Sequence, residues 1–152
     1  MSNPVRFLVV DDEPVVRQAF ARVLAGEHCI VETVADGRQA LCKMQQQPFD
    51  VVLLDLKMPG MDGMTVLRTI KQNWPESEVV VITGYPSIES AKEAIRLGAY
   101  DYLAKPVGPD EVIDAAARAI LHKDWTLRPD ETGPDHTNQI HNAARGECRC
   151  AA

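Results

Sequence analysis

Several short apolar segments of this chain end in a side chain that could take part in chemistry. The residues at these ends are Asp11, Asp12, Asp55, Thr83 and Lys105. Taken singly, each has an ordinary structural explanation, because Asp favours turns and helix starts, Thr is common in strands, and Lys before Pro suits an exposed turn. Taken together, carboxylates, a hydroxyl and an ammonium group are the groups that a metal ion and a phosphoryl group require. The set predicts a phosphoryl-transfer site, provided that the fold brings these side chains together.

The segments that must position these residues are strands that alternate with amphipathic helices. Strand-like runs cover 5–10, 29–34, 78–83 and 99–104, and a further run begins at Asp50 and ends at Asp55. Helix signals lie between them: Pro14 to Gly26, Asp36 to just before Pro48, a segment with Val66, Leu67, Ile70 and Trp74, Ser87 to Gly98, and Pro109 to Leu121. The last helix is expected to bury Val112, Ile113, Ala116, Ala117 and Ile120.

Strict alternation of strand and helix predicts an α/β fold with a single doubly wound (βα)5 parallel sheet. For this sheet we expect the flavodoxin-like strand order 2-1-3-4-5. In that order the first and third strands are neighbours, so Asp11, Asp12 and Asp55 should crowd together at their carboxyl ends. Like charges at such short range raise each other's pKa unless a cation lies between them. Hard oxygen ligands of this kind favour Mg²⁺, or Mn²⁺.

Thr83 and Lys105 complete the predicted site at the ends of the next two strands. An ammonium group at Lys105 would offset the charge of a phosphoryl group on Asp55, and the Thr83 hydroxyl would donate to one of its oxygens. The set therefore predicts that the Asp55 carboxylate attacks a phosphoryl donor while the metal ion neutralises charge on the transferred group.

Length and charge limit the remaining possibilities. A chain of 152 residues suits one domain plus a tail, and its net charge of −6 argues against direct binding to nucleic acid or to an anionic membrane. No apolar run is long enough to span a membrane, so we expect a soluble, cytoplasmic protein. Residues 123–152 are polar and rich in Pro and Gly, which predicts a disordered tail without an output domain. Its His136, His141, Cys148 and Cys150 have spacings outside the usual structural zinc patterns.

Four motifs resemble the receiver domain of bacterial response regulators. They are LVVDDEP at 8–14, DVVLLDLKMPG at 50–60, VITGY at 81–85 and GAYDYLAKP at 98–106. The motifs stand in the family's order, and the resemblance covers roughly 5–122, so the expected domain is 1–122.

The resemblance implies a role for each acid. Asp55 would be the phospho-acceptor, which receives its phosphoryl group from the phosphohistidine of a sensor histidine kinase or from a phosphotransfer protein. Asp12 would bind Mg²⁺ directly and Asp11 through water, and the Lys57 main-chain carbonyl would complete the protein ligands.

The resemblance also assigns roles around the acids. Thr83 and Tyr102 would be the switch pair, in which the hydroxyl moves to the phosphoryl group and the ring turns inward. Lys105 would bind the phosphoryl group, with a cis bond to Pro106. Lys57 and Tyr85 would tune the access of hydrolytic water.

The family therefore implies a phosphorylation-controlled signalling switch that catalyses its own phosphoryl transfer and slow dephosphorylation, and is not a dedicated enzyme. A downstream protein would dock on the face formed by the fourth helix, fifth strand and fifth helix, and a phosphorylation-dependent homodimer is one option. The alternatives are a receiver-like binding module without the chemistry, or a receiver fragment of a larger DNA-binding regulator. A phosphohydrolase is disfavoured because Lys57 stands where such enzymes place a second acid, and a flavin binder because the first loop is acidic.

Overall fold

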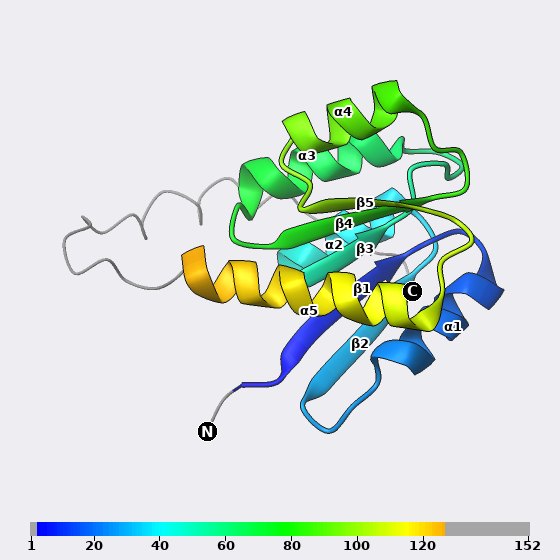
Figure 1. The fold of residues 1–152 in the computed structure, drawn as a ribbon. Coiled ribbons are helices and arrows are strands. Elements are labelled where there is room, and N and C mark those ends of the chain that lie inside the picture. Colours follow the sequence, from blue (N-terminus) through cyan, green and yellow to red (C-terminus); the bar gives the residue numbers. More distant parts are fainter. Residues whose placement is uncertain (1–2, 127–152) are drawn as a thin grey trace, which may run out of the picture.

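Five strands and five helices alternate along residues 3–126, the part of the chain that the computed structural model describes (Figure 1). The strands are β1 Val5–Val10, β2 Cys29–Val34, β3 Val51–Leu54, β4 Glu78–Thr83 and β5 Asp101–Ala104. The helices are α1 Pro14–Leu24, α2 Gly37–Gln46, α3 Gly63–Asn73, α4 Ile88–Arg96 and α5 Pro109–Thr126. The predicted tail began at residue 123, but residues 123–126 belong to α5. The rest of that segment, 127–152 with its His and Cys residues, lies outside the described residues.

The strands form one parallel sheet in the order β2-β1-β3-β4-β5, which confirms the predicted fold class and strand order. The register aligns Val10 with Leu54, and Leu54 with Val81. The residues that follow β1 and β3 therefore leave the sheet side by side. Thr83 is likewise aligned with Ala104, so the residues that follow β4 and β5 also leave the sheet side by side.

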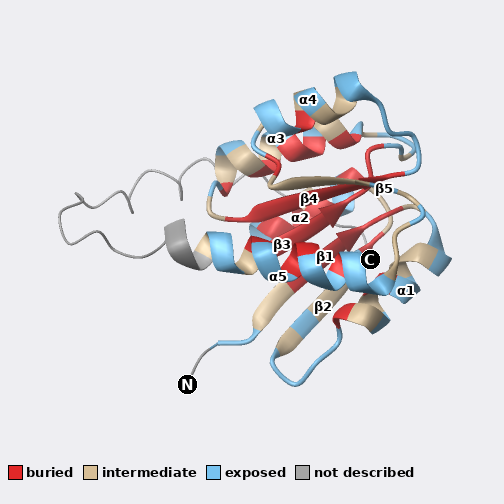
Figure 2. Ribbon diagram, in the orientation of Figure 1, coloured by how far each residue is buried: buried red, intermediate tan, exposed pale blue. Residues whose placement is uncertain are grey.

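Both faces of the sheet are covered, and its central strands form the core (Figure 2). One face packs against α2, α3 and α4, and the other against α1 and α5. Side chains alternate between the faces along β3, with Val52 and Leu54 on the first and Val51 and Leu53 on the second. All four are buried, which is why this strand reads as a continuous apolar run.

Helix starts follow the predicted capping signals. The Asp36 side chain accepts a hydrogen bond from the Gln39 backbone N–H at 2.8 Å, and the Gln39 side chain accepts one from Ala35 N–H at 3.1 Å. Ser87 caps α4 in the same way by accepting from Ser90 N–H at 3.0 Å. These caps fix where α2 and α4 leave the loops that precede them.

The fifth strand begins at Asp101, later than the predicted start at residue 99. Gly98 adopts a positive φ of 105°, and the Ala99 N–H bonds to the Ala94 carbonyl at 2.9 Å. Ala99 therefore takes part in the C-terminal end of α4, although the apolar pattern alone had assigned it to the strand.

The buried side of α5 differs from the prediction in two residues. Val112 and Ala116 are buried as expected, but Ile113 and Ala117 are exposed. The buried stripe follows helical spacing through Val112, Ala115, Ala116 and Ala119. The sequence was ambiguous because an alanine-rich helix has small apolar residues on every side.

The last helix also continues past the expected end at Leu121, to Thr126. Near its end, α5 contacts two acids, one at the start of β4 and one just before β3. His122 Nδ1 lies 3.2 Å from Glu78 Oε2, and Lys123 forms an ion pair with Asp50. These contacts join residues far apart in the sequence, so helix periodicity could not indicate them. No helix within residues 3–126 is long and apolar enough to cross a membrane.

Candidate functional site at the carboxyl edge of the sheet

Three acids meet where β1 and β3 end. Asp11, Asp12 and Asp55 each offer a carboxylate oxygen, and these oxygens lie within 4.8 Å of one another. Backbone bonds set this geometry, because Asp55 N–H donates to the Val10 carbonyl at 2.9 Å and Asp11 N–H to the Val34 carbonyl at 3.2 Å. The fold therefore brings together the three acids that the sequence pattern singled out.

Two of these acids are buried and fixed by the backbone. Asp11 is only 2% exposed and Asp55 only 4%, whereas Asp12 is more accessible. Asp11 Oδ1 accepts from Glu13 N–H at 2.9 Å, and Asp55 Oδ1 accepts from Lys57 N–H at 3.2 Å. One oxygen of each buried carboxylate is thus occupied, and the other faces Lys105.

Lys105 reaches the acids from the end of β5. Its Nζ lies 2.7 Å from Asp11 Oδ2, 3.5 Å from Asp55 Oδ2 and 3.8 Å from Glu13 Oε1. Its backbone N–H donates to the Thr83 carbonyl at 2.8 Å, and its bond to Pro106 is cis, as expected. The ammonium group therefore lies between the two buried carboxylates.

These contacts shift the pKa values of two groups. Burial, followed by the charge of Asp11, raises the pKa of Asp55 above its ordinary value, although Lys105 opposes the change. Burial would lower the pKa of Lys105, but its hydrogen bond to Asp11 and the charges of Asp11, Asp55 and Glu13 outweigh it and raise that pKa. The raised pKa means that Lys105 does not fully offset the cost of a charged Asp55 in a buried site beside Asp11. An additional cation would lower that cost.

A cavity of about 230 Å³ opens beside these residues. It is lined by Asp12, Glu13, Asp55, Lys57, Gly84, Tyr85 and Lys105. The sequence pattern had singled out most of these, but not Glu13 or Gly84. Each directly follows a predicted site residue, and that adjacency was the available signal. The cavity gives a ligand direct access to the Asp55 carboxylate.

A family model for the response regulator receiver domain matches residues 7–117. The chain belongs to the receiver domain family. Receiver domains bind Mg²⁺ at an acidic pocket and interact with histidine kinases or phosphotransfer proteins. They are domains of two-component response regulators and not dedicated enzymes.

Curated relatives and solved structures agree with this assignment. The chain is 39% identical over 121 residues to the DNA-binding transcriptional regulator NtrC of Salmonella typhimurium, a match that covers 80% of this chain and 26% of the relative. A CheY-like receiver domain protein from Methanospirillum hungatei superposes with a TM-score of 0.78 at 27% identity and covers 82% of this chain and 99% of that one. NtrX from Brucella abortus in complex with ADP superposes at 0.76, with 35% identity, over 87% of this chain and 31% of that one. The chain thus spans about a quarter of the length of the curated relatives it matches.

The two residues expected to form the switch pair of this receiver domain, Thr83 and Tyr102, do not line the cavity. Thr83 is fully buried, and its hydroxyl accepts a hydrogen bond from Tyr85 N–H at 3.1 Å. The Tyr102 ring packs against the core on the α4 side, and its hydroxyl contacts Ser87 and Ser90 at the start of α4. Both side chains therefore hold the segment that joins β4 to α4.

Gly63 is a further part of this site that the sequence pattern did not mark. A Cβ atom there would lie 2.5 Å from Leu56 Cα and 2.7 Å from the Asp55 carbonyl oxygen, closer than any real contact. Only glycine lets the start of α3 approach the loop behind Asp55 so closely. The residue thus supports the position of Asp55 without contacting the cavity.

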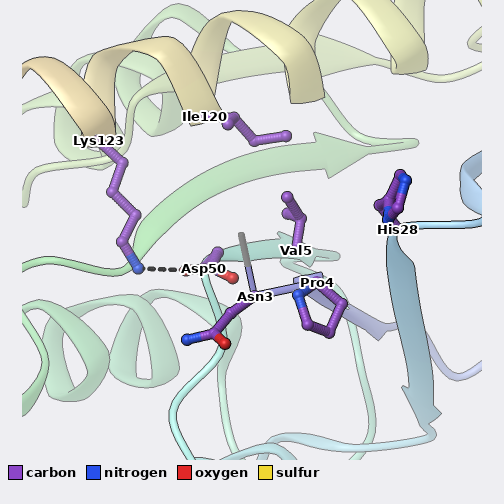
Figure 3. Close-up of a pocket in the computed structure, with 7 residues that line it drawn as sticks. All are labelled: Asn3, Pro4, Val5, His28, Asp50, Ile120 and Lys123. Carbon is purple, nitrogen blue, oxygen red and sulfur yellow. Dashed lines mark hydrogen bonds and ion pairs between the residues drawn. The ribbon is translucent and has the colours of Figure 1, made fainter. Parts of the chain in front are cut away.

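The receiver domain has a second hollow at the opposite edge of the sheet, with a volume of about 330 Å³ (Figure 3). It is lined by Asn3, Pro4, Val5, His28, Asp50, Ile120 and Lys123. Its one carboxylate, Asp50, accepts from Arg6 N–H at 2.8 Å and forms an ion pair with Lys123. Asp50 and Asp55 therefore differ in kind, since the first fastens α5 to the sheet and the second faces a cavity.

Proposed function

We propose that this receiver domain is a phosphorylation-controlled switch in which Asp55 accepts a phosphoryl group from the phosphohistidine of a sensor histidine kinase or phosphotransfer protein. The observation that carries the proposal is the Asp55 carboxylate at a cavity wall, 3.5 Å from the Lys105 ammonium. In the transfer, an Asp55 oxygen forms a bond to phosphorus while the phosphorus–nitrogen bond breaks. The departing imidazole keeps that electron pair.

The chain's own charges suit this reaction. Lys105 stands where it can offset the negative charge that arrives with the phosphoryl group. Its link to Asp11 at 2.7 Å holds the ammonium in place before the donor binds. Lys57 and Tyr85, both exposed at the cavity wall, are placed to adjust the access of water during slow dephosphorylation.

The acids fit a divalent cation. Asp11, Asp12 and Asp55, with the Lys57 main-chain carbonyl, would hold Mg²⁺ or Mn²⁺, since all are hard oxygen donors. The ion, when bound, supplies positive charge that stabilises the transferred group.

The output of the switch is proposed to be a changed docking surface. Movement of the Thr83 hydroxyl toward the phosphoryl group would release Tyr85 N–H, and Tyr102 would carry the change toward α4 and β5. The exposed side chains Ile88, Ile95 and Ile113 give α4 and α5 an apolar surface on which a partner protein or a second copy could dock.

The coverage of about a quarter of each curated relative favours this chain as the receiver part of a longer DNA-binding regulator that acts in the cytoplasm. The receiver itself, in a chain with a net charge of −6, is not expected to contact nucleic acid.

The first test is phosphoryl uptake measured by intact mass. The protein with Mg²⁺ and a small acyl-phosphate donor should gain one phosphoryl group, and Asp55→Asn should gain none. Asp50→Asn is the matched control, because it alters an acid at the other end of the same strand and should leave uptake intact. Equal uptake by Asp55→Asn would disprove the assignment of the acceptor. No uptake and no Mg²⁺ binding by the unaltered protein would instead indicate a binding module.

A further inference from the structure

The start of α4 carries a hydroxyl network that the phosphoryl chemistry does not require. Tyr102 OH lies 2.5 Å from Ser90 Oγ and accepts from Ser87 N–H at 3.3 Å. The Ser87 and Ser90 side chains are also bonded to each other at 2.9 Å. The network joins β5 to the first turn of α4 across the end of the sheet.

Each hydroxyl has one proton to donate and can accept further hydrogen bonds through its oxygen. Ser87 Oγ donates to Ser90 Oγ, and Ser90 Oγ donates to the Ser87 carbonyl at 3.2 Å. Either hydroxyl can be the donor between Tyr102 OH and Ser90 Oγ, and the Tyr102 oxygen also accepts from Ser87 N–H. Ser90 Oγ is thus the hydrogen-bond partner that orients the Tyr102 hydroxyl.

This contact is separable from the helix cap. The cap of α4 is the bond from Ser90 backbone N–H to Ser87 Oγ at 3.0 Å, and any residue at position 90 other than Pro can donate it. The Ser90 side chain is therefore free for another role, and Ala would serve the helix at least as well.

We propose that Ser90 is a positioning residue that ties the Tyr102 hydroxyl to the first turn of α4 before any phosphoryl group arrives. The Thr83 hydroxyl accepts a hydrogen bond from Tyr85 N–H, and the Tyr102 hydroxyl accepts one from Ser87 N–H. The expected switch pair therefore bonds to both ends of the segment between β4 and α4. Ser90 orients the Tyr102 hydroxyl that accepts from Ser87 N–H. A movement of Thr83 and its loop would therefore also move the first turn of α4. The inference builds on the proposed function, because the switch role of Tyr102 belongs to that proposal.

The direct test is the NMR signal of the tyrosine ring carbon that bears the hydroxyl. The chain has only three tyrosines, and Tyr102→Phe identifies the Tyr102 signal by its loss. Ser90→Ala should move that signal toward the one from Tyr85, which is exposed. Ser90→Thr, which keeps a hydroxyl, and Lys92→Ala, an exposed change on the same helix, should not move it. An unmoved Tyr102 signal in Ser90→Ala would overturn the proposal.

Hydrogen exchange then tests the link to α4. Without a donor, Ser90→Ala should speed exchange in the first turn of α4 about fivefold, as expected for loss of one net hydrogen bond. Tyr102→Phe also removes the acceptor of Ser87 N–H, so it should speed exchange at least as much. The double variant should match Tyr102→Phe, and effects that simply add would contradict the proposal. Phosphoryl uptake by Ser90→Ala should equal that of the unaltered protein. If neither takes up phosphate, the proposed function fails, while the comparison without donor still decides the role of Ser90.

Discussion

The chemistry of Asp55 comes from its surroundings, since Asp50 at the other end of the same strand is the same type of residue. Asp55 is 4% exposed, faces a cavity and has Asp11 as a close neighbour. Asp50 is bonded to Arg6 N–H and to Lys123. Burial and the charge of Asp11 raise the pKa of the first carboxylate despite Lys105, whereas the second is paired with a cation and a backbone donor.

We predict that Asp55→Asn stabilises the metal-free protein at neutral pH. Burial and the charge of Asp11 raise the pKa of Asp55 in the folded state above its ordinary value of 3.8, so ionising Asp55 destabilises the fold. This penalty is complete above the folded pKa and absent below about 3.8.

Urea unfolding in a chelating buffer, from below pH 3.8 to pH 7, measures the difference in free energy of unfolding between Asp55→Asn and the unaltered protein. The variant should be the more stable protein at pH 7. Its advantage should disappear as the pH falls from the folded-state pKa of Asp55 to the ordinary value of 3.8. A variant less stable than the unaltered protein at pH 7 would show that the Asp55 charge is satisfied without a metal ion.

At the scale of elements, the segment between β3 and α3 determines how closely the helix approaches the site. Gly63 N–H donates to the Leu56 carbonyl at 3.3 Å, and the Gly63 Cα faces backbone atoms of Asp55 and Leu56. Backbone cannot move aside as a flexible side chain can, so this approach depends on the missing Cβ.

Gly63→Ala should therefore destabilise the fold by about 1–3 kcal/mol through overpacking. It should also weaken Mg²⁺ binding, because the added methyl group displaces the backbone that carries Asp55. Gly26→Ala is the control, since the nearest atom to its Cβ would be Cys29 Sγ at 3.6 Å, an ordinary contact. Thermal unfolding and a Mg²⁺ titration measure the two effects. Equal stability of both variants would show that the α3 start can shift freely.

At the scale of the whole molecule, the two hollows lie at opposite edges of one sheet, and Ile120 and Lys123 of α5 line the second of them. At the carboxyl edge, charge is concentrated around Asp55 and Lys105. At the other edge, Glu78 and Asp50 hold the last turn of α5. Binding energy gained at the first edge adds to the stability of the entire domain, because a ligand that binds only the folded state favours folding.

Mg²⁺ should accordingly stabilise the domain, by ~2.7 kcal/mol at a concentration one hundred times its dissociation constant. Asp12→Asn should reduce the gain by weakening the affinity, whereas Asp114→Asn, an exposed acid on α5, should not. Unfolding with and without Mg²⁺ measures this. A gain unchanged by Asp12→Asn would mean that the ion binds elsewhere.

The sequence by itself determined the alternation of elements and the placing of Asp11, Asp12, Asp55, Thr83 and Lys105 at strand ends, because these follow from periodicity and from the shared direction of parallel strands. The strand order was expected from flavodoxin-like sheets, and the backbone pairing confirms it. Only the tertiary structure decided the contacts between distant residues. It set the Lys105 distances, the close approach at Gly63, the Tyr102 bond to Ser90, the exposure of Ile113 and the continuation of α5 to Thr126. Local pattern carries no information about which side chain from another element will fill a given space, and that pairing is fixed by packing.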